Sequence, residues 1–331
     1  GYTGKPDSYY NAIINWVKQR YDLIVTKEVI NFVPGIVPGI GMAMNCFTQK
    51  GDKVMIQPPV YHPFAWVTTR NERTLVINPL KWENGMYRMD LDAFREQIKG
   101  CKLFILCNPH NPGGVVWTEA ELRAIADICY DEKVLVFSDE IHADLTLPPH
   151  THRPFATVSE KARMNSVTFM SPSKAFNMPG LSASHALIFN EDLRKRFRIY
   201  MDAGELDMGH VFAFLSVEAA YSHGTEWLDQ CLAYIQGNID FVDEFLKKHA
   251  PKIKAIRPEA SYLVWLDCRE LELSQKDLNE FFVDKAHLAL NDGEMFGKEG
   301  IGFMRLNVAS PRCIIEKAMK QLADAYQLYI K

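Results

Sequence analysis

The segment at residues 170–180, MSPSKAFNMPG, follows an apolar run, residues 166–170, that has the pattern of a buried strand. Lys174 is therefore expected just beyond a strand end, with the hydroxyl groups of Ser171 and Ser173 beside it. Ligands of open α/β sheets bind outside the carboxyl ends of the strands, and a lysine among apolar neighbours can form a Schiff base. Taken alone, the segment fits an ordinary surface lysine in a Ser/Pro loop better.

A second polar turn follows the apolar run at residues 103–107, which has the composition of a strand buried on both faces. The run stops at NPHNPGG, residues 108–114, where two Asn-Pro steps and two glycines require a non-helical turn that includes Asn111. Thr118 and Glu121 then form a capping box, which predicts the start of a helix.

A third strand end carries two acids. Residues 134–137 have the pattern of a strand, and the sequence SDEIH, residues 138–142, follows. Asp139 or Glu140 could pair with a cationic ring nitrogen, since a buried carboxylate needs a partner, but a helix cap or a surface acid is the commoner role of such residues. The order strand, turn, helix, strand predicts an α/β protein with a parallel sheet and right-handed crossovers.

Two features nearer the N-terminus fit a ligand with a phosphate and a flat ring. Gly35 lies in FVPGIVPGIG, residues 32–41, which predicts a strand that turns into a helix N-terminus. Free N–H groups there favour a phosphate, although a plain βα turn explains the glycines equally well. Tyr61 follows the strand predicted at residues 53–56, where its ring either stacks on a ligand or packs as a core or lid residue.

The chain changes character after one or two long amphipathic helices predicted at residues 226–249. Short strands and further helices follow, which indicates an α+β arrangement. We therefore divide the chain into a large domain, residues 1–230, and a small domain, residues 231–331. Arg305 lies in an apolar strand of the small domain, where it either pairs internally or awaits an anionic ligand.

Composition excludes several classes of protein. The 331 residues carry a formal net charge of -4 and no basic patch of the size that nucleic-acid binding needs. The seven cysteines contain no C-x-x-C pair, which is typical of small core residues in a reducing compartment. His150 and His152 have no carboxylate or cysteine at ligand spacing, so no metal site is expected. The sequence shows no signal peptide or membrane-spanning run, and a cytoplasmic location is predicted.

The order of these features resembles that of the fold-type-I pyridoxal-phosphate enzymes of the class I/II aminotransferase superfamily, over nearly the whole chain. Three phrases, NPHNPGGVVW (residues 108–117), SDEIH (residues 138–142) and SPSKAFN (residues 171–177), most resemble the cystathionine β-lyase or C–S lyase branch, the MalY/PatB type. The resemblance implies a large domain of the transferase type with a mostly parallel central sheet and helices on both faces, and a smaller α+β domain.

The resemblance also implies pyridoxal 5'-phosphate as cofactor and roles for four residues around its ring. Lys174 would bind the cofactor as a Schiff base and, once displaced, take the Cα proton of the substrate. Asp139 would keep the pyridine nitrogen protonated, which makes the ring an electron sink. Asn111 would bind the phenolic oxygen, and Tyr61 would stack on the ring.

The remaining implied roles concern the phosphate and the substrate. Arg305 would bind the substrate α-carboxylate through both guanidinium N–H pairs. His142 would contact the cofactor where aminotransferases usually have a tyrosine. The phosphate would be bound by backbone N–H groups and by hydroxyl groups, which belong to Gly35, Ile36, Val37, Ser171 and Ser173.

Three positions bear on the branch and the assembly. Many aminotransferases carry a phosphate-binding arginine where this chain has Ser182, and both Ser182 and His142 favour a lyase. The counterpart of Tyr2 reaches the phosphate in the neighbouring subunit, which implies a homodimer with shared active sites. Members of the family carry a segment before this tyrosine, and that segment is expected to be absent here.

The predicted reaction is α,β-elimination from L-cystathionine or an L-cysteine-type substrate, which releases a thiol, pyruvate and ammonia. The nearest alternative is an aminotransferase. The alternative from another class is a pyridoxal-phosphate-binding protein with impaired catalysis or a regulatory role.

Overall fold

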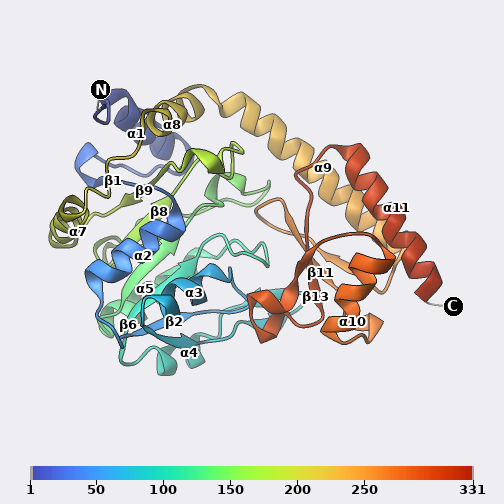
Figure 1. Cartoon of the computed structure of the whole chain (residues 1–331). Helices are drawn as coiled ribbons and strands as arrows, with labels where there is room; N and C mark the ends of the chain where they lie inside the picture. The colour runs from blue at the N-terminus through green and yellow to red at the C-terminus, as the bar shows by residue number, and fades with distance from the viewer. Residues whose placement is uncertain (1–2, 330–331) are drawn as a thin grey trace.

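The computed structural model describes residues 3–329, which form two main β-sheets enclosed by helices (Figure 1). The large sheet consists of β1 (Ile30–Val33), β2 (Lys53–Ile56), β3 (Thr74–Ile77), β6 (Cys101–Cys107), β7 (Leu135–Asp139), β8 (Ser166–Met170) and β9 (Ser184–Leu187). The helices before residue 224 are α1 (Asp7–Tyr21), α2 (Ile36–Phe47), α3 (Pro63–Arg70), α4 (Leu91–Gln97), α5 (Glu119–Asp131), α6 (Glu160–Met164), α7 (Glu191–Ala203) and α8 (Val211–His223).

The large sheet has the order β1-β9-β8-β7-β6-β2-β3. Strands β3, β2, β6, β7 and β8 pair in parallel, and β9 runs antiparallel to both β8 and β1. The predicted α/β class and the mostly parallel sheet are therefore confirmed. Because parallel strands share one carboxyl edge, the ends of β6, β7 and β8 lie side by side.

The large sheet is buried on both faces, as its apolar strands require. Along β6, Leu103 and Ile105 join one hydrophobic cluster, which includes residues of α2, α3 and α7. Phe104 and Leu106 join the cluster on the opposite face, which includes residues of α4 and α5. The alternation of side chains along a strand thus accounts for helices on both faces.

The C-terminal residues form the second sheet, which is antiparallel and has the order β10-β11-β13-β12. Its elements are β10 (Lys254–Ile256), β11 (Leu263–Asp267), β12 (Asn291–Asp292), β13 (Phe303–Asn307), α10 (Gln275–Glu280) and α11 (Arg312–Tyr329). The long helix α9 (Thr225–His249) runs from the large sheet's helices to this sheet (Figure 1). The predicted division between residues 230 and 231 falls inside α9.

Local sequence signals explain several element boundaries. The capping box of Thr118 and Glu121 is present at the start of α5. The Asn190 side chain accepts hydrogen bonds from the first turn of α7. At the tip of the hairpin formed by β4 (Lys81–Glu83) and β5 (Met86–Arg88), Asn84 and Gly85 have φ angles of 51° and 80°, the left-handed values that an Asn-Gly turn provides.

One predicted boundary was wrong by two residues, because the strand predicted at residues 134–137 extends to Asp139 in β7. Helix α3 begins at Pro63, at a position where a helix needs no N–H donor. Within residues 3–329, no helix combines the length and the apolar character needed to cross a membrane.

Candidate active site

A cavity of about 540 Å³ lies at the carboxyl edge of the large sheet, where the second sheet faces it. All but two of the predicted site residues line it. Ser171 is buried behind the wall, and Tyr2 lies outside the described residues. The residues brought together are Gly35, Ile36, Val37, Tyr61, Asn111, Asp139, His142, Ser173, Lys174 and Arg305.

Lys174 lies four residues beyond the end of β8, in a tight turn that also contains the two predicted serines. The Ser171 hydroxyl donates to the Ala183 carbonyl at 2.8 Å and lies 2.9 Å from the Ser173 hydroxyl. Lys174 is partly buried and takes part in none of the ion pairs among the described residues. Its amine is therefore held at the cavity without a carboxylate that would bind it.

Asp139 and Glu140 are adjacent in sequence but have different surroundings. Asp139 lines the cavity, is 4 % exposed, and accepts a hydrogen bond from the Ile141 N–H at 3.1 Å. Burial raises the pKa of Asp139 to about 7, and the Glu140 carboxylate adds to this effect. A cation inside the cavity would stabilise the ionised form of Asp139.

Glu140 points away from the cavity into a hydrogen-bonded network. Its carboxylate accepts hydrogen bonds from the Ser138 hydroxyl and the Phe155 N–H, each at 2.8 Å, and lies 2.8 Å from His152 Nε2. The sequence left both acids as candidates, and the structure assigns Glu140 to this network. Since its partners satisfy it, Glu140 does not compete with Asp139 for a ligand in the cavity.

The three histidines near this strand end have different contacts. Within residues 3–329 no cluster of three or more potential ligands could hold a metal ion. His150 faces Glu259 at 3.7 Å, and His152 contacts Glu140. Glu259 is distant in sequence, and Glu140 lies directly after β7. The spacing of the two histidines in the H-x-H motif therefore did not reveal either carboxylate as a partner. His142 lines the cavity, and burial lowers its pKa to about 3, so its ring is neutral at physiological pH.

Arg305 on β13 is held by neutral partners. It donates to Asn111 Oδ1 at 2.9 Å and to Asn291 Oδ1 at 2.8 Å, and it lies 4.7 Å from the centre of the Phe296 ring. No ion pair among the described residues includes Arg305. Burial lowers its pKa to about 10, so it stays protonated at neutral pH. Of the two alternatives left by the sequence, this geometry favours an anionic ligand.

Asn111 connects the two sheets at the cavity. Its side-chain oxygen accepts the hydrogen bond from Arg305, so its amide N–H groups remain for a ligand. Asn111 is only 6 % exposed, and its backbone N–H donates to Cys107 Sγ at 3.3 Å. The side chain is thus oriented before any ligand binds.

The N-terminus of helix α2 forms part of the cavity wall. Gly35 precedes α2 with φ of 135°, a backbone angle that other residues rarely adopt. Gly35, Ile36 and Val37 line the cavity at the start of this helix, where backbone N–H groups lack partners inside the helix. Ser173 approaches the same cavity, and together these donors can bind a phosphate.

Sequence reasoning missed several residues of the cavity. His62 and Tyr262 line it, and so does Ser182, which had been considered only for the arginine that it replaces. Tyr262 lies one residue before β11, as Tyr61 lies two residues before α3. An aromatic residue at the edge of an element was therefore the available signal. Asn291, on β12, could not be found from sequence because only the register with β13 brings it to Arg305.

Comparison with known proteins gives consistent matches over the length of the chain. The family model described as aminotransferase class I and II matches residues 2–322. Cystathionine beta-lyase PatB of Bacillus subtilis is 38% identical over 98% of this chain and 84% of its own length. Protein MalY of Escherichia coli is 29% identical over 97% of this chain and 82% of its own length.

Two solved structures extend this likeness to three dimensions. Cystalysin from Treponema denticola, which contains pyridoxal 5'-phosphate, superposes with a TM-score of 0.97 at 34% identity, covering 100% of this chain and 84% of that one. A C–S lyase from Staphylococcus hominis with bound pyridoxal phosphate superposes with a TM-score of 0.91 at 33% identity, covering 98% of this chain and 84% of that one.

Proposed function

The chain belongs to the aminotransferase class I and II family, and we propose that it is a carbon–sulfur β-lyase that depends on pyridoxal 5'-phosphate. The proposal rests on one observation above the rest. Lys174, Asp139, Asn111 and Arg305 line a single cavity in a chain whose relatives include a cystathionine beta-lyase, cystalysin and a C–S lyase of known structure. The substrate class is an amino acid with a sulfur substituent on Cβ, such as L-cystathionine or L-cysteine.

The cavity fits the cofactor at three points. Asp139 is a buried carboxylate without a cationic side-chain partner among the described ion pairs, which suits a protonated ring nitrogen. The N-terminus of α2 suits the phosphate, and the Lys174 amine suits the aldehyde. When bound, pyridoxal 5'-phosphate supplies an electron sink for the negative charge that develops at the substrate Cα.

The chain's own residues then bind the substrate and move one proton. Arg305 binds the α-carboxylate, and its two asparagine partners fix the plane of the guanidinium group. The Lys174 amine takes the proton from Cα, after which the carbon–sulfur bond breaks and the thiolate leaves. Asn111 would donate to the phenolic oxygen of the cofactor, and the Tyr61 side chain would stack on the face of the cofactor ring. His142 and Ser173 complete the wall.

A lyase and an aminotransferase differ in their products. Purified protein with its cofactor should release pyruvate and a thiol in equal amounts from L-cystathionine, without any 2-oxo acid added. Turnover that requires a 2-oxo acid would instead identify an aminotransferase. Visible absorbance of bound cofactor without turnover of any sulfur amino acid would contradict the lyase and support a binding or regulatory protein.

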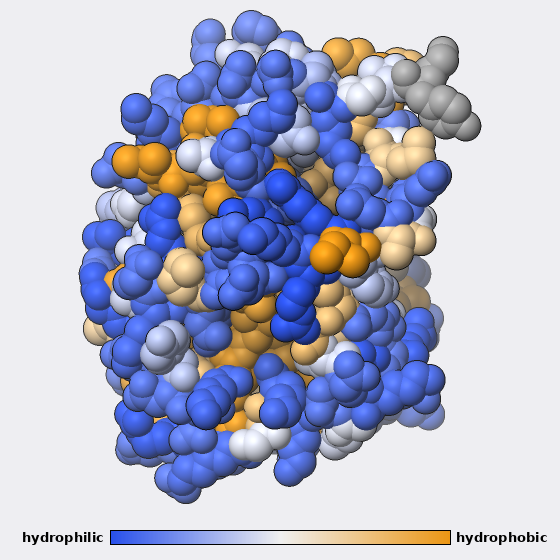
Figure 2. Space-filling model, turned by 90° about the vertical axis from the view of Figure 1, so that its left-hand side faces the viewer, coloured by the Kyte–Doolittle hydropathy of each residue, from blue (hydrophilic) through white to orange (hydrophobic). Residues whose placement is uncertain are grey.

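The proposed assembly is a homodimer, in which Tyr2 would reach the phosphate site of the partner. Exposed apolar side chains near the start of α8 support an interface: Phe212 is 66% exposed, and Val211 and Leu215 are also exposed. Figure 2 shows apolar groups between hydrophilic ones on the side of the molecule that carries α7. Sedimentation would test the dimer.

We also propose a cytoplasmic location, which suits the seven free cysteines within the described residues.

A further inference from the structure

The loop between β10 and β11 connects the second sheet to the large one. We call residues 257–261 the strap. The backbone N–H groups of Glu259 and Ala260 donate to the Gly114 carbonyl at 2.8 and 3.0 Å. On its other side the strap pairs with the loop after β7, because the Ser261 N–H donates to the Leu145 carbonyl at 2.8 Å.

Gly114 permits this close approach. Its φ angle is 68°, and a Cβ built on it would lie 2.5 Å from the Cβ of Pro258 in the strap. No other residue fits there without displacing the strap. The second glycine of the NPHNPGG turn is therefore required because Pro258, from a distant part of the chain, packs directly against it.

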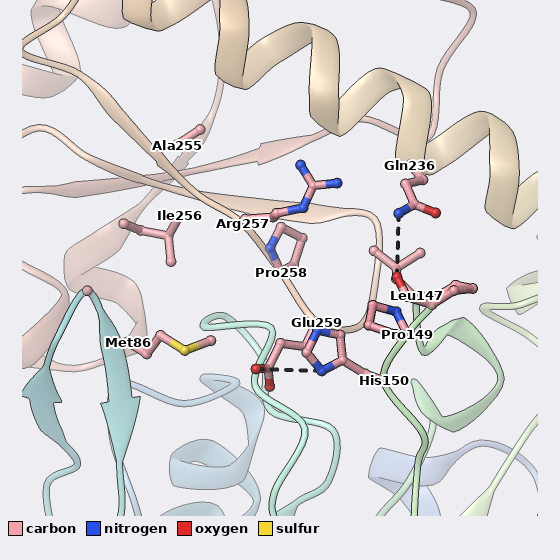
Figure 3. A pocket seen from close by; sticks show the side chains of 12 residues that line it. Met86, Leu147, Pro149, His150, Gln236, Ala255, Ile256, Arg257, Pro258 and Glu259 are labelled. Carbon is pink, nitrogen blue, oxygen red and sulfur yellow. Dashed lines mark hydrogen bonds and ion pairs between the residues drawn. The ribbon is translucent and has the colours of Figure 1, made fainter.

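The Glu259 carboxylate fastens the strap to both loops. One of its oxygens accepts a hydrogen bond from the Val116 N–H at 2.8 Å, and the other lies 3.7 Å from His150 Nδ1. Figure 3 shows the Glu259 and His150 side chains directed toward each other beside a cavity of about 450 Å³. In the same view Gln236 of α9 reaches the loop that carries His150, where it donates to the Pro148 carbonyl at 3.4 Å.

Both ends of this connection lead to the active site. The turn that ends at Val116 also contains Asn111, and it is closed by a hydrogen bond of 2.8 Å from the His110 N–H to the Val115 carbonyl. The strap continues directly into Tyr262 and then β11, which pairs with the β13 strand that carries Arg305. Glu259 thus joins the Asn111 turn to the strap, and the strap leads into β11, which pairs with the strand whose Arg305 donates to Asn111.

We propose that Glu259 is a positioning residue: it holds the strap against the Asn111 turn and thereby sets the position of Arg305 for the substrate carboxylate. The inference rests on the proposed function only for the carboxylate. Removing the Glu259 side chain leaves the Val116 N–H without its partner and the strap with backbone contacts alone. The second sheet can then shift relative to Asn111. The main expected consequence is weaker binding of the substrate.

Hydrogen exchange of the full chain tests the contact itself, with and without cofactor. In Glu259→Ala the amides within residues 110–116 and 257–261, prolines excepted, should exchange about ten-fold faster than in wild type, since the partly buried Val116 N–H loses its acceptor. Glu259→Gln keeps an oxygen for Val116 and should restore most of the protection. The matched control is Glu270→Ala, which removes an exposed carboxylate that pairs with Lys254 of β10 and lies in the turn after β11. Wild-type exchange in Glu259→Ala would overturn the inference.

Kinetics with L-cystathionine test the consequence. Glu259→Ala should raise KM about ten-fold with kcat changed less than about three-fold, and Glu259→Gln should lie near wild type, because uniform substrate binding is what is lost. A fall in kcat as large as the rise in KM, with no rescue in Glu259→Gln, would overturn the positioning role. Faster exchange in a protein without lyase activity would support the contact while refuting the proposed function. Normal lyase kinetics in Glu259→Ala would refute the inference alone.

Discussion

The two walls of the active-site cavity are constructed differently. On the large-sheet side, Asp139 ends β7, and Asn111 and Lys174 follow the neighbouring parallel strands β6 and β8, so backbone pairing fixes the spacing of these strand ends. On the opposite side, Arg305 belongs to a separate sheet that reaches the first through loop contacts and side-chain hydrogen bonds, among them those of Arg305 with Asn111 and of Glu259 with the Val116 N–H. The wall proposed to bind the cofactor is therefore rigid. The position of the wall proposed to bind the substrate depends on how the second sheet packs against the large sheet.

The largest expected effect belongs to the rigid wall. Lys174→Ala should abolish the visible absorbance of the covalently bound cofactor and lower the rate of pyruvate release by at least about 10³-fold, since both the imine and the base are lost. Lys195→Ala, which removes an exposed lysine paired with Glu191 on α7, is the control. Turnover close to wild type in Lys174→Ala would refute the assigned role.

Asp139→Asn tests the second residue of that wall. The amide is neutral and cannot stabilise a cationic ring nitrogen, so kcat should fall by about 10² to 10³-fold with a smaller change in KM. Pyruvate release under saturating L-cystathionine measures this. Asp131→Asn, at an exposed position on α5, serves as the matched substitution. A loss confined to KM would contradict the assignment.

Arg305→Lys tests the docked wall and should act mainly on substrate binding. Lysine keeps the charge but cannot bind a carboxylate through two parallel hydrogen bonds, so KM should rise by about 10 to 100-fold while cofactor absorbance is retained. Arg123→Lys, in an exposed ion pair on α5, is the comparison. If KM stays at the wild-type value, the carboxylate is bound elsewhere.

The smallest expected effect is on the stability of the protein without cofactor. The folded-state pKa of Asp139 is raised to about 7, so the folded protein binds this proton more tightly than the unfolded chain. The contribution to stability is greatest below the unfolded pKa and declines as the pH rises toward 7. The side chain in Asp139→Asn cannot ionise, so this decline in stability with rising pH is absent.

The melting temperature of Asp139→Asn should therefore exceed that of wild type by a margin that grows from about pH 4 to about pH 7 and is constant above. Adding pyridoxal 5'-phosphate should reverse the order near pH 7, because a ring cation then stabilises ionised Asp139. A margin independent of pH would show that burial does not perturb this carboxyl group.

The difference between the walls also determines what sequence could predict. Lys174, Asp139 and Asn111 each follow a short apolar run, and the rule for parallel strands brings such strand ends together, so their proximity could be predicted locally. The α/β class followed from the same runs and is confirmed. The catalytic roles assigned through the family resemblance remain predictions.

Long-range contacts could not be predicted. His152 and Glu140, or Glu259 and Val116, meet only because distant loops pack together. Asn291 reaches Arg305 through the register of a two-residue strand, which no sequence pattern marks. These contacts fix which acid faces the cavity and how Arg305 is oriented, and they depend on tertiary packing rather than on local propensity.

Helix α9 has 25 residues, which corresponds to a rod of about 37 Å at 1.5 Å per residue. This helix connects the helices of the large sheet to the second sheet. A tilt of about 5° at one end displaces the other by about 3 Å, which is the whole length of a hydrogen bond. A bend at the start of this rod, far from the cavity, would therefore move the second sheet, and Arg305 with it, by about that distance.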